Sequence, residues 1–127
     1  MPIHKSGEDY LETIYVLSKR HAGIHAIDIA NEFNYAKPSI TKALKILKAN
    51  GFIVIDEDTK HIILTEKGLE RAEEIFDRHQ TLTKFWILNG VDPESAAADA
   101  CRMEHDISPA TFACVKAIVQ KSDEFRE

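Results

Sequence analysis

Three side chains that can bind a metal ion lie close together in the segment Cys101-Arg102-Met103-Glu104-His105. Positions i, i+3 and i+4 of a helix share one face, so this spacing places a thiol, a carboxylate and an imidazole together. Asp9 and Glu12 are also three residues apart, near the start of the chain, and His79 lies midway along a long helical stretch. Cys101, Glu104, His105, Asp9, Glu12 and His79, from three predicted helices, are therefore the candidate metal ligands.

Each of these residues also has an ordinary structural explanation. Acidic residues in the first turns of a helix are favoured by the helix dipole, which accounts for Asp9 and Glu12 without a ligand. His79 by itself fits a half-buried histidine, and Cys101 by itself fits a small core residue. A hydrolytic Cys–His pair is disfavoured, because Cys101 and His105 lie on one predicted helix and no glycine-rich turn adjoins them. The Cys-x-x-Glu-His combination is the feature that favours metal binding.

A second group of residues is suited to bind an anion. The chain has 16 Lys and Arg against 21 Asp and Glu, a net charge of −5, which argues against a protein that coats nucleic acid indiscriminately. Residues 34–55 nevertheless contain four lysines and no acidic residue. The residues predicted to contact DNA phosphates and base edges are Lys37, Pro38, Ser39, Thr41, Lys42 and Lys45. The alternative is that these lysines form only the solvated face of a surface helix.

The apolar pattern predicts the elements that position these residues. Helices are expected at about 7–21, 26–33, 38–50, 66–89, 93–105 and 109–121, and a β-hairpin is expected from two β-branched runs at 52–55 and 61–64. Helix, helix, turn, helix and hairpin is the order of a winged helix-turn-helix, whose third helix enters the DNA major groove. The fold class is therefore mainly α, with a winged helix-turn-helix at 1–68 and a helical unit at 69–127. Cys114 has helical spacing with the apolar residues around it and is predicted to be structural or on the surface, not a ligand.

The composition also predicts the compartment. No run of 18 apolar residues exists, and the start of the chain has no apolar segment of the kind found in signal peptides, so we expect neither a membrane span nor a secreted protein. Two cysteines thirteen residues apart are not a disulfide framework and fit a reducing compartment. The expected location is cytoplasmic.

Over about residues 6–122 the sequence resembles the iron- and manganese-dependent repressors of the diphtheria toxin repressor and manganese transport regulator family. The resemblance rests on five segments in the same order: Glu8–Tyr15, Lys37–Lys42, Leu64–Gly68, Arg78–His79 and Ala100–His105. It implies a transcriptional repressor of metal-homeostasis genes, not an enzyme, that binds palindromic double-stranded DNA as a homodimer. It also implies a C-terminal dimerisation unit, the short form without an SH3-like domain, and activation by Fe(II) or Mn(II), for which Co(II), Ni(II) or Zn(II) can substitute.

The same resemblance assigns the metal site to the six candidate ligands. Manganese-type members have an acidic residue at both the Asp9 and the Cys101 positions, whereas iron-type members have Met at the first and Cys at the second. This chain takes one residue from each type. The thiolate of Cys101 favours Fe(II) and later ions, while the oxygens of Asp9 and Glu12 suit Mn(II). The iron-type second site is not expected, because its acid and histidine fall at Thr83 and Ala97.

Two alternatives stay open at this point, and one departure from the family stands out. The chain could be a winged-helix regulator that no metal controls, or a small helical di-metal enzyme of the kind that helix bundles support. The departure is the acidic hairpin loop Asp56-Glu57-Asp58, which would repel DNA phosphates. We therefore expect little DNA contact from this loop beyond Lys60.

Overall fold

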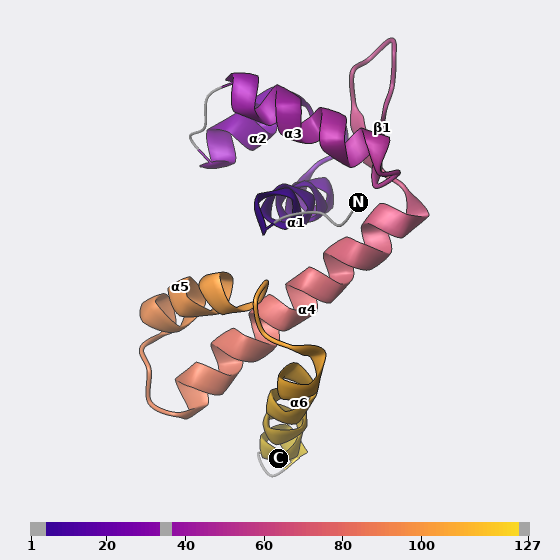
Figure 1. Cartoon of the computed structure of the whole chain (residues 1–127). Coiled ribbons are helices and arrows are strands. Elements are labelled where there is room, and N and C mark those ends of the chain that lie inside the picture. Colours follow the sequence, from indigo (N-terminus) through magenta and orange to yellow (C-terminus); the bar gives the residue numbers. More distant parts are fainter. Residues whose placement is uncertain (1–4, 34–36, 125–127) are drawn as a thin grey trace. The chain divides into compact units, whose positions relative to one another are not determined.

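A computed structural model of the chain describes residues 5–33 and 37–124, of which residues 5, 6, 33, 37–39 and 124 are described by their backbone alone (Figure 1). In chain order the elements are α1 (Lys5–Arg20), α2 (Ala26–Phe33), α3 (Lys37–Ala49), β1 (Ile53–Ile55), β2 (Ile62–Leu64), α4 (Glu66–Leu88), α5 (Pro93–Met103) and α6 (Pro109–Glu124). The chain divides into two compact units, Met1–Glu73 and Glu74–Glu127, with the boundary inside α4. The mainly α fold predicted from the sequence is confirmed.

Helices α1, α2 and α3 pack against one another and enclose the core of the first unit. The apolar residues predicted on the first helix are all buried: Tyr10, Leu11, Ile14, Tyr15 and Leu17. On α3, Ile40, Leu44 and Leu47 are buried as their spacing predicts. On α2, Ile29 is buried, whereas Ile27 is 49% exposed and lines a hollow between α2 and α3.

The β-hairpin packs one of its faces onto the core of the first unit. Strands β1 and β2 are antiparallel with Val54 opposite Ile63, and these two side chains are exposed while Ile53 and Ile62 point into the core. Gly68, in the first turn of α4, packs directly against the backbone of Phe52, just before β1. A Cβ added at Gly68 would lie 1.9 Å from the carbonyl oxygen of Phe52. No other residue fits there, so glycine at this position allows α4 to leave the hairpin in a fixed direction.

The second unit contains the rest of α4 together with α5 and α6. Its buried apolar residues include Ile75, Leu82, Ala96, Ala100 and Val119. Two ion pairs join α4 to α6: Lys116 Nζ lies 2.6 Å from Asp77 Oδ2, and Lys84 Nζ lies 2.5 Å from Asp123 Oδ1. Among the described residues, no helix is long and apolar enough to cross a lipid bilayer.

Most element boundaries agree with the sequence prediction to within two residues, and one larger departure lies in the second unit. Helix α6 continues to Glu124, three residues beyond the predicted end. Cys114 is exposed, which agrees with the surface position that the sequence prediction allows for it. The inner side of α6 is set by Val119, with Phe112 and Val115 half-buried, and Cys114 lies off that side of the helix.

Candidate metal centre

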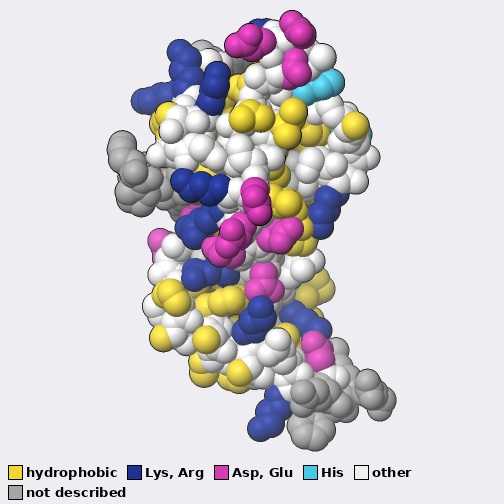
Figure 2. Space-filling view, turned by 90° about the vertical axis from the view of Figure 1, so that its right-hand side faces the viewer, with side chains coloured by type: hydrophobic (Ala, Val, Ile, Leu, Met, Phe, Trp, Pro, Cys, Tyr) yellow, Lys and Arg dark blue, Asp and Glu magenta, His cyan; other side chains and the backbone are white. Residues whose placement is uncertain are grey.

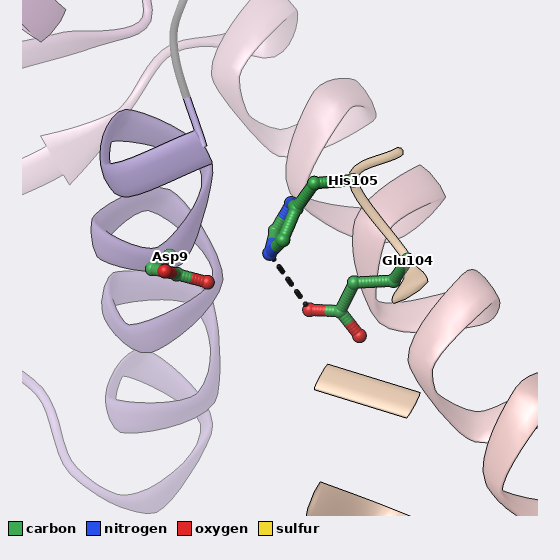
Figure 3. Close-up of side chains that lie close together, drawn as sticks. All are labelled: Asp9, Glu104 and His105. Atoms are coloured by element: carbon green, nitrogen blue, oxygen red, sulfur yellow. Dashed lines mark ion pairs between the residues drawn. The ribbon is translucent and has the colours of Figure 1, made fainter. Parts of the chain in front are cut away.

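A buried carboxylate lies between two histidines in the second unit. Glu104 is 2% exposed, and its Oε2 lies 2.9 Å from Nδ1 of His79, which projects from α4. Its Oε1 lies 3.2 Å from Nε2 of His105, the next residue in the turn after α5 (Figure 3). The His105 side chain is 2% exposed and that of His79 is 27% exposed. The structure thus brings three of the six predicted ligands together.

The charge of Glu104 requires a partner, because an isolated carboxylate removed from water is strongly unfavourable. Glu104 Oε1 has hydrogen-bond geometry with no group in the described residues, although His105 Nε2 is near. Neighbouring ligands at ~2.1 Å from a six-coordinate ion lie about 3 Å apart. Each carboxylate oxygen of Glu104 lies at such a distance from one imidazole nitrogen, Oε2 at 2.9 Å from His79 and Oε1 at 3.2 Å from His105. The two carboxylate–imidazole pairs therefore have the spacing and the chemistry of ligands for a divalent transition-metal ion.

Cys101 differs from these three residues in its surroundings. The cysteine is exposed on α5, whereas Glu104, one turn further on, is buried. The sequence places Cys101, Glu104 and His105 on one face of one helix, and this is wrong for His105, because α5 ends at Met103 and Glu104 is its C-cap. The histidine approaches Glu104 from the turn that follows.

The two remaining candidate ligands belong to α1 in the first unit. Asp9 and Glu12 are one turn apart and both are half-buried. Their neighbour Glu8 is buried and forms an ion pair with Arg71 at the start of α4. The sequence accounts for Glu8 only as an acidic residue in a first helical turn, since nothing local indicates a partner 63 residues away.

Thr83 occupies the position at which a second iron-type site would have its acid. Its Oγ1 donates a hydrogen bond of 2.7 Å to the carbonyl oxygen of His79 one turn earlier on α4. The hydroxyl is thus used by the helix itself.

The candidate DNA-contacting residues lie on α3. Thr41, Lys42 and Lys45 are exposed, and Lys37, Pro38 and Ser39 are in the first turn of the helix, where their side chains lie outside the described residues. A groove of about 720 Å³ runs between α3 and the hairpin. Lysines of α3 line one wall, and the acidic loop Asp56–Asp58 lines the other. In Figure 2 acidic side chains gather at the top of the view, and a separate group of basic side chains lies to their left.

Asp56 shapes the hairpin loop. Its Oδ1 accepts hydrogen bonds from the backbone N–H of Thr59, at 2.9 Å, and of Asp58, at 2.8 Å. These two bonds lower the pKa of the Asp56 carboxyl, with the bond from Thr59 contributing most. Asp56 therefore holds the turn together through its carboxylate, and Asp56, Glu57 and Asp58 are all exposed acidic residues of the loop.

Arg78 has contacts at the candidate metal centre that the sequence does not predict. Its guanidinium donates to the backbone carbonyl oxygens of Glu104 and Ile107. The only local signal is its place directly before His79, in a segment that resembles the repressor family.

Two family models together cover nearly the whole chain. Residues 3–62 match the model described as the N-terminal DNA binding domain of the iron dependent repressor, and residues 65–124 match its metal binding and dimerisation domain. Both descriptions agree with the two units of the structure and with the resemblance found in the sequence.

Curated proteins and solved structures give the same picture. An uncharacterised helix-turn-helix regulator of Methanocaldococcus jannaschii is 34% identical over 92% of this chain and 94% of its own length. The transcriptional regulator MntR of Escherichia coli O6:H1 is 32% identical over 90% of this chain and 73% of its own length. The manganese regulator SloR has the same fold, with a TM-score of 0.78 at 24% identity over 94% of this chain. The chain spans 55% of the length of that solved structure.

These matches confirm the family to which the sequence pattern points and remove the alternative of a di-metal enzyme. The chain belongs to the iron-dependent repressor family, whose members are DNA-binding, metal-dependent transcriptional regulators.

Proposed function

We propose that this chain represses genes of metal-ion homeostasis by binding a palindromic operator as a homodimer when Fe(II) or Mn(II) is bound. The observation that carries the proposal is the buried Glu104 carboxylate between His79 and His105. It supports a cation site, because the donor set suits a first-row divalent ion and the carboxylate otherwise lacks a full set of partners.

The proposed ligands are Asp9, Glu12, His79, Cys101, Glu104 and His105. A bound divalent ion would supply positive charge that offsets the carboxylates and the thiolate. Two imidazoles and one thiolate favour Fe(II) over Mn(II), while three carboxylates keep Mn(II) in competition, so the free concentrations of the two ions decide which one activates. Co(II), Ni(II) or Zn(II) would substitute in vitro.

The proposed DNA contacts are made by the first turns of α3. Lys42 and Lys45 are exposed and would neutralise phosphates, and Thr41 would donate to phosphate or base-edge oxygens. Lys37, Pro38 and Ser39 stay in the proposed interface on the strength of the sequence pattern. In a homodimer the two recognition helices would meet successive major grooves, about 34–36 Å apart or a multiple of that distance.

The proposed control of DNA binding follows from the origin of the ligands. Asp9 and Glu12 belong to the DNA-binding domain, proposed at 1–68, and the other four belong to the metal-binding and dimerisation domain, proposed at 69–127. A ligand set drawn from both would favour one arrangement of the dimer over others when metal is bound. Allosteric couplings of this kind typically change affinity about 5- to 150-fold.

The test is a fluorescence-anisotropy titration of labelled DNA from the region upstream of the gene for this protein. It is run anaerobically with Mn(II), Fe(II), Co(II) or Zn(II), and with chelator. We expect DNA binding that metal strengthens and chelator reverses. The Glu104→Gln variant should lose the metal effect, and Glu94→Gln, which changes an exposed acid on the same helix, should retain it. DNA binding that neither metal nor chelator changes would contradict control by metal and would indicate a winged-helix regulator that responds to another signal.

Lys42→Ala separates the two activities of the proposed repressor. This variant should bind DNA more weakly at saturating metal, because it loses a phosphate contact, while its metal affinity equals that of the wild type. A Lys42→Ala variant that binds the DNA as tightly as the wild type would remove α3 from the interface.

A further inference from the structure

Three consecutive residues of α4 each contact a later segment of the second unit. Asp77 forms an ion pair with Lys116 on α6, with 2.6 Å between Asp77 Oδ2 and Lys116 Nζ. His79 Nδ1 lies 2.9 Å from the Glu104 carboxylate. Between them, Nη1 of Arg78 donates to the carbonyl oxygen of Glu104 at 3.1 Å and to that of Ile107 at 2.9 Å.

Both carbonyls that Arg78 contacts belong to the turn between α5 and α6. Helix α5 ends with Glu104 as its C-cap, and the N–H groups of Asp106 and Ile107 both return to the carbonyl oxygen of Met103. The last carbonyls of a helix have no partner within the helix, so a donor from elsewhere must satisfy them. A guanidinium suits this task, because it is a rigid planar donor whose charge strengthens each hydrogen bond.

Packing fixes the orientation of this guanidinium. Its central carbon lies 5.2 Å from the centre of the Phe112 ring, within cation–π distance. Phe112 is half-buried in the first turn of α6. Arg78 is thus restrained by an aromatic ring on one side and by two carbonyl oxygens on the other.

We propose that Arg78 is a positioning residue of the metal centre, an inference that rests on the proposed metal-dependent function. Arg78 and His79 hold the same residue at its two ends, since Arg78 binds the main-chain carbonyl of Glu104 and His79 contacts its carboxylate. Arg78 also holds Ile107, so the intervening His105 is fixed from both sides. The turn is ordered before metal arrives, and metal binding does not have to offset the entropy of ordering it.

The experiment compares metal binding by full-length wild type, Arg78→Gln and Lys84→Gln. Lys84 is the matched control, because its ion pair with Asp123 also joins α4 to α6 but contacts neither Glu104 nor Ile107. Affinities for Mn(II) are measured by calorimetry, and the visible spectrum of bound Co(II) reports the coordination geometry. Circular dichroism defines a temperature at which each variant is fully folded.

We expect Arg78→Gln to bind Mn(II) about 10- to 100-fold more weakly than wild type, the usual loss when a group that orients a ligand is removed. Its Co(II) spectrum should change as well, whereas Lys84→Gln should match the wild type in both. Arg78→Lys provides a second variant should the first fail to fold. It keeps the charge but not the planar donor, and it should also bind metal more weakly than wild type.

Three results would overturn the inference, and they can be told apart. Equal affinity and an equal Co(II) spectrum for wild type and both Arg78 variants would remove the positioning role alone. An equal loss in Lys84→Gln would show that the effect is one of general stability. Absence of metal binding by the wild type would overturn the proposed function and the role of Arg78 together.

Discussion

The buried charge of Glu104 predicts how the Glu104→Gln variant changes thermal stability, and the direction of that change depends on whether metal is bound. The carboxylate is buried and one of its oxygens has hydrogen-bond geometry with none of the described groups. Replacing it with the neutral amide of glutamine removes a charge that is costly to bury. In chelator we therefore expect Glu104→Gln to unfold at the same temperature as wild type or above it. With free metal at about 100 times Kd, the wild type should gain about 2.7 kcal/mol and the variant nothing.

Thermal unfolding followed by circular dichroism checks this prediction, with Glu94→Gln as the exposed control on the same helix. A Glu104→Gln protein that is much less stable than wild type in chelator would show that the carboxylate is a structural group. Equal stabilisation of both proteins by metal would remove Glu104 from the ligand set.

Cys101 is the residue at which metal preference is expected to be set. The thiolate favours Fe(II), and a carboxylate in its place would give the oxygen-rich set that suits Mn(II). Cys101→Glu should therefore lower the ratio of Fe(II) to Mn(II) affinity relative to wild type. Competition titrations under anaerobic conditions measure this ratio. An unchanged ratio would agree with the exposure of Cys101 and would exclude the thiol from the site.

At the scale of elements, the acidic residues of the hairpin loop are expected to weaken DNA binding. Glu57 and Asp58 carry exposed charge beside a groove lined by the α3 lysines, while Asp56 is engaged by its own turn. Glu57→Gln with Asp58→Asn should therefore raise DNA affinity, because two charges that repel phosphate are removed. The gain should be a few-fold at low salt and should shrink as salt rises, since salt screens exposed charges. Anisotropy titrations over a salt series measure it, and an unchanged affinity at low salt would place the loop away from the DNA.

The same loop has a predicted pH dependence. The backbone hydrogen bonds that lower the pKa of Asp56 stabilise the turn when the carboxylate is charged. This stabilisation is complete above the ordinary carboxyl pKa of 3.8 and is lost as the pH falls through the lowered value. The amide proton signals of Asp58 and Thr59 should therefore move together on acidification, with a midpoint below 3.8. A midpoint at or above the ordinary value would show that the two bonds do not form in solution.

The elements that the sequence predicts best are those with a strong local pattern. The stripe of apolar residues on α1 and the two β-branched runs of the hairpin each determine an element within a few residues. The end of α5 is different, because the partner of the Glu104 carbonyl is Arg78, 26 residues earlier in the chain. No local pattern reveals that contact, so the helix is predicted to run on to His105. The pairing of Glu8 with Arg71 escapes prediction for the same reason.

At the scale of the whole molecule, family membership establishes the two-domain regulator that the sequence pattern predicts. Two family models and relatives at 32–34% identity agree with the order of elements. The three candidate ligands in contact within the second unit come from α4 and from the end of α5 and the turn after it. Their spacing of 25 and 26 residues from His79 gives no indication of contact, so chemistry and resemblance are required to connect them.

If the proposed ligands are drawn from both units, metal and DNA binding must be linked in both directions. Any factor by which metal strengthens DNA binding is also the factor by which DNA strengthens metal binding, because the four states form a closed thermodynamic cycle. We expect a factor between about 5 and 150, measured once from DNA titrations with and without Mn(II) and once from Mn(II) titrations with and without operator DNA. Asp9→Asn tests the origin of the coupling. If Asp9 couples the units, this variant retains metal binding through His79, Glu104 and His105, and both factors fall toward one. Equal Mn(II) affinity with and without DNA in the wild type would exclude control by metal.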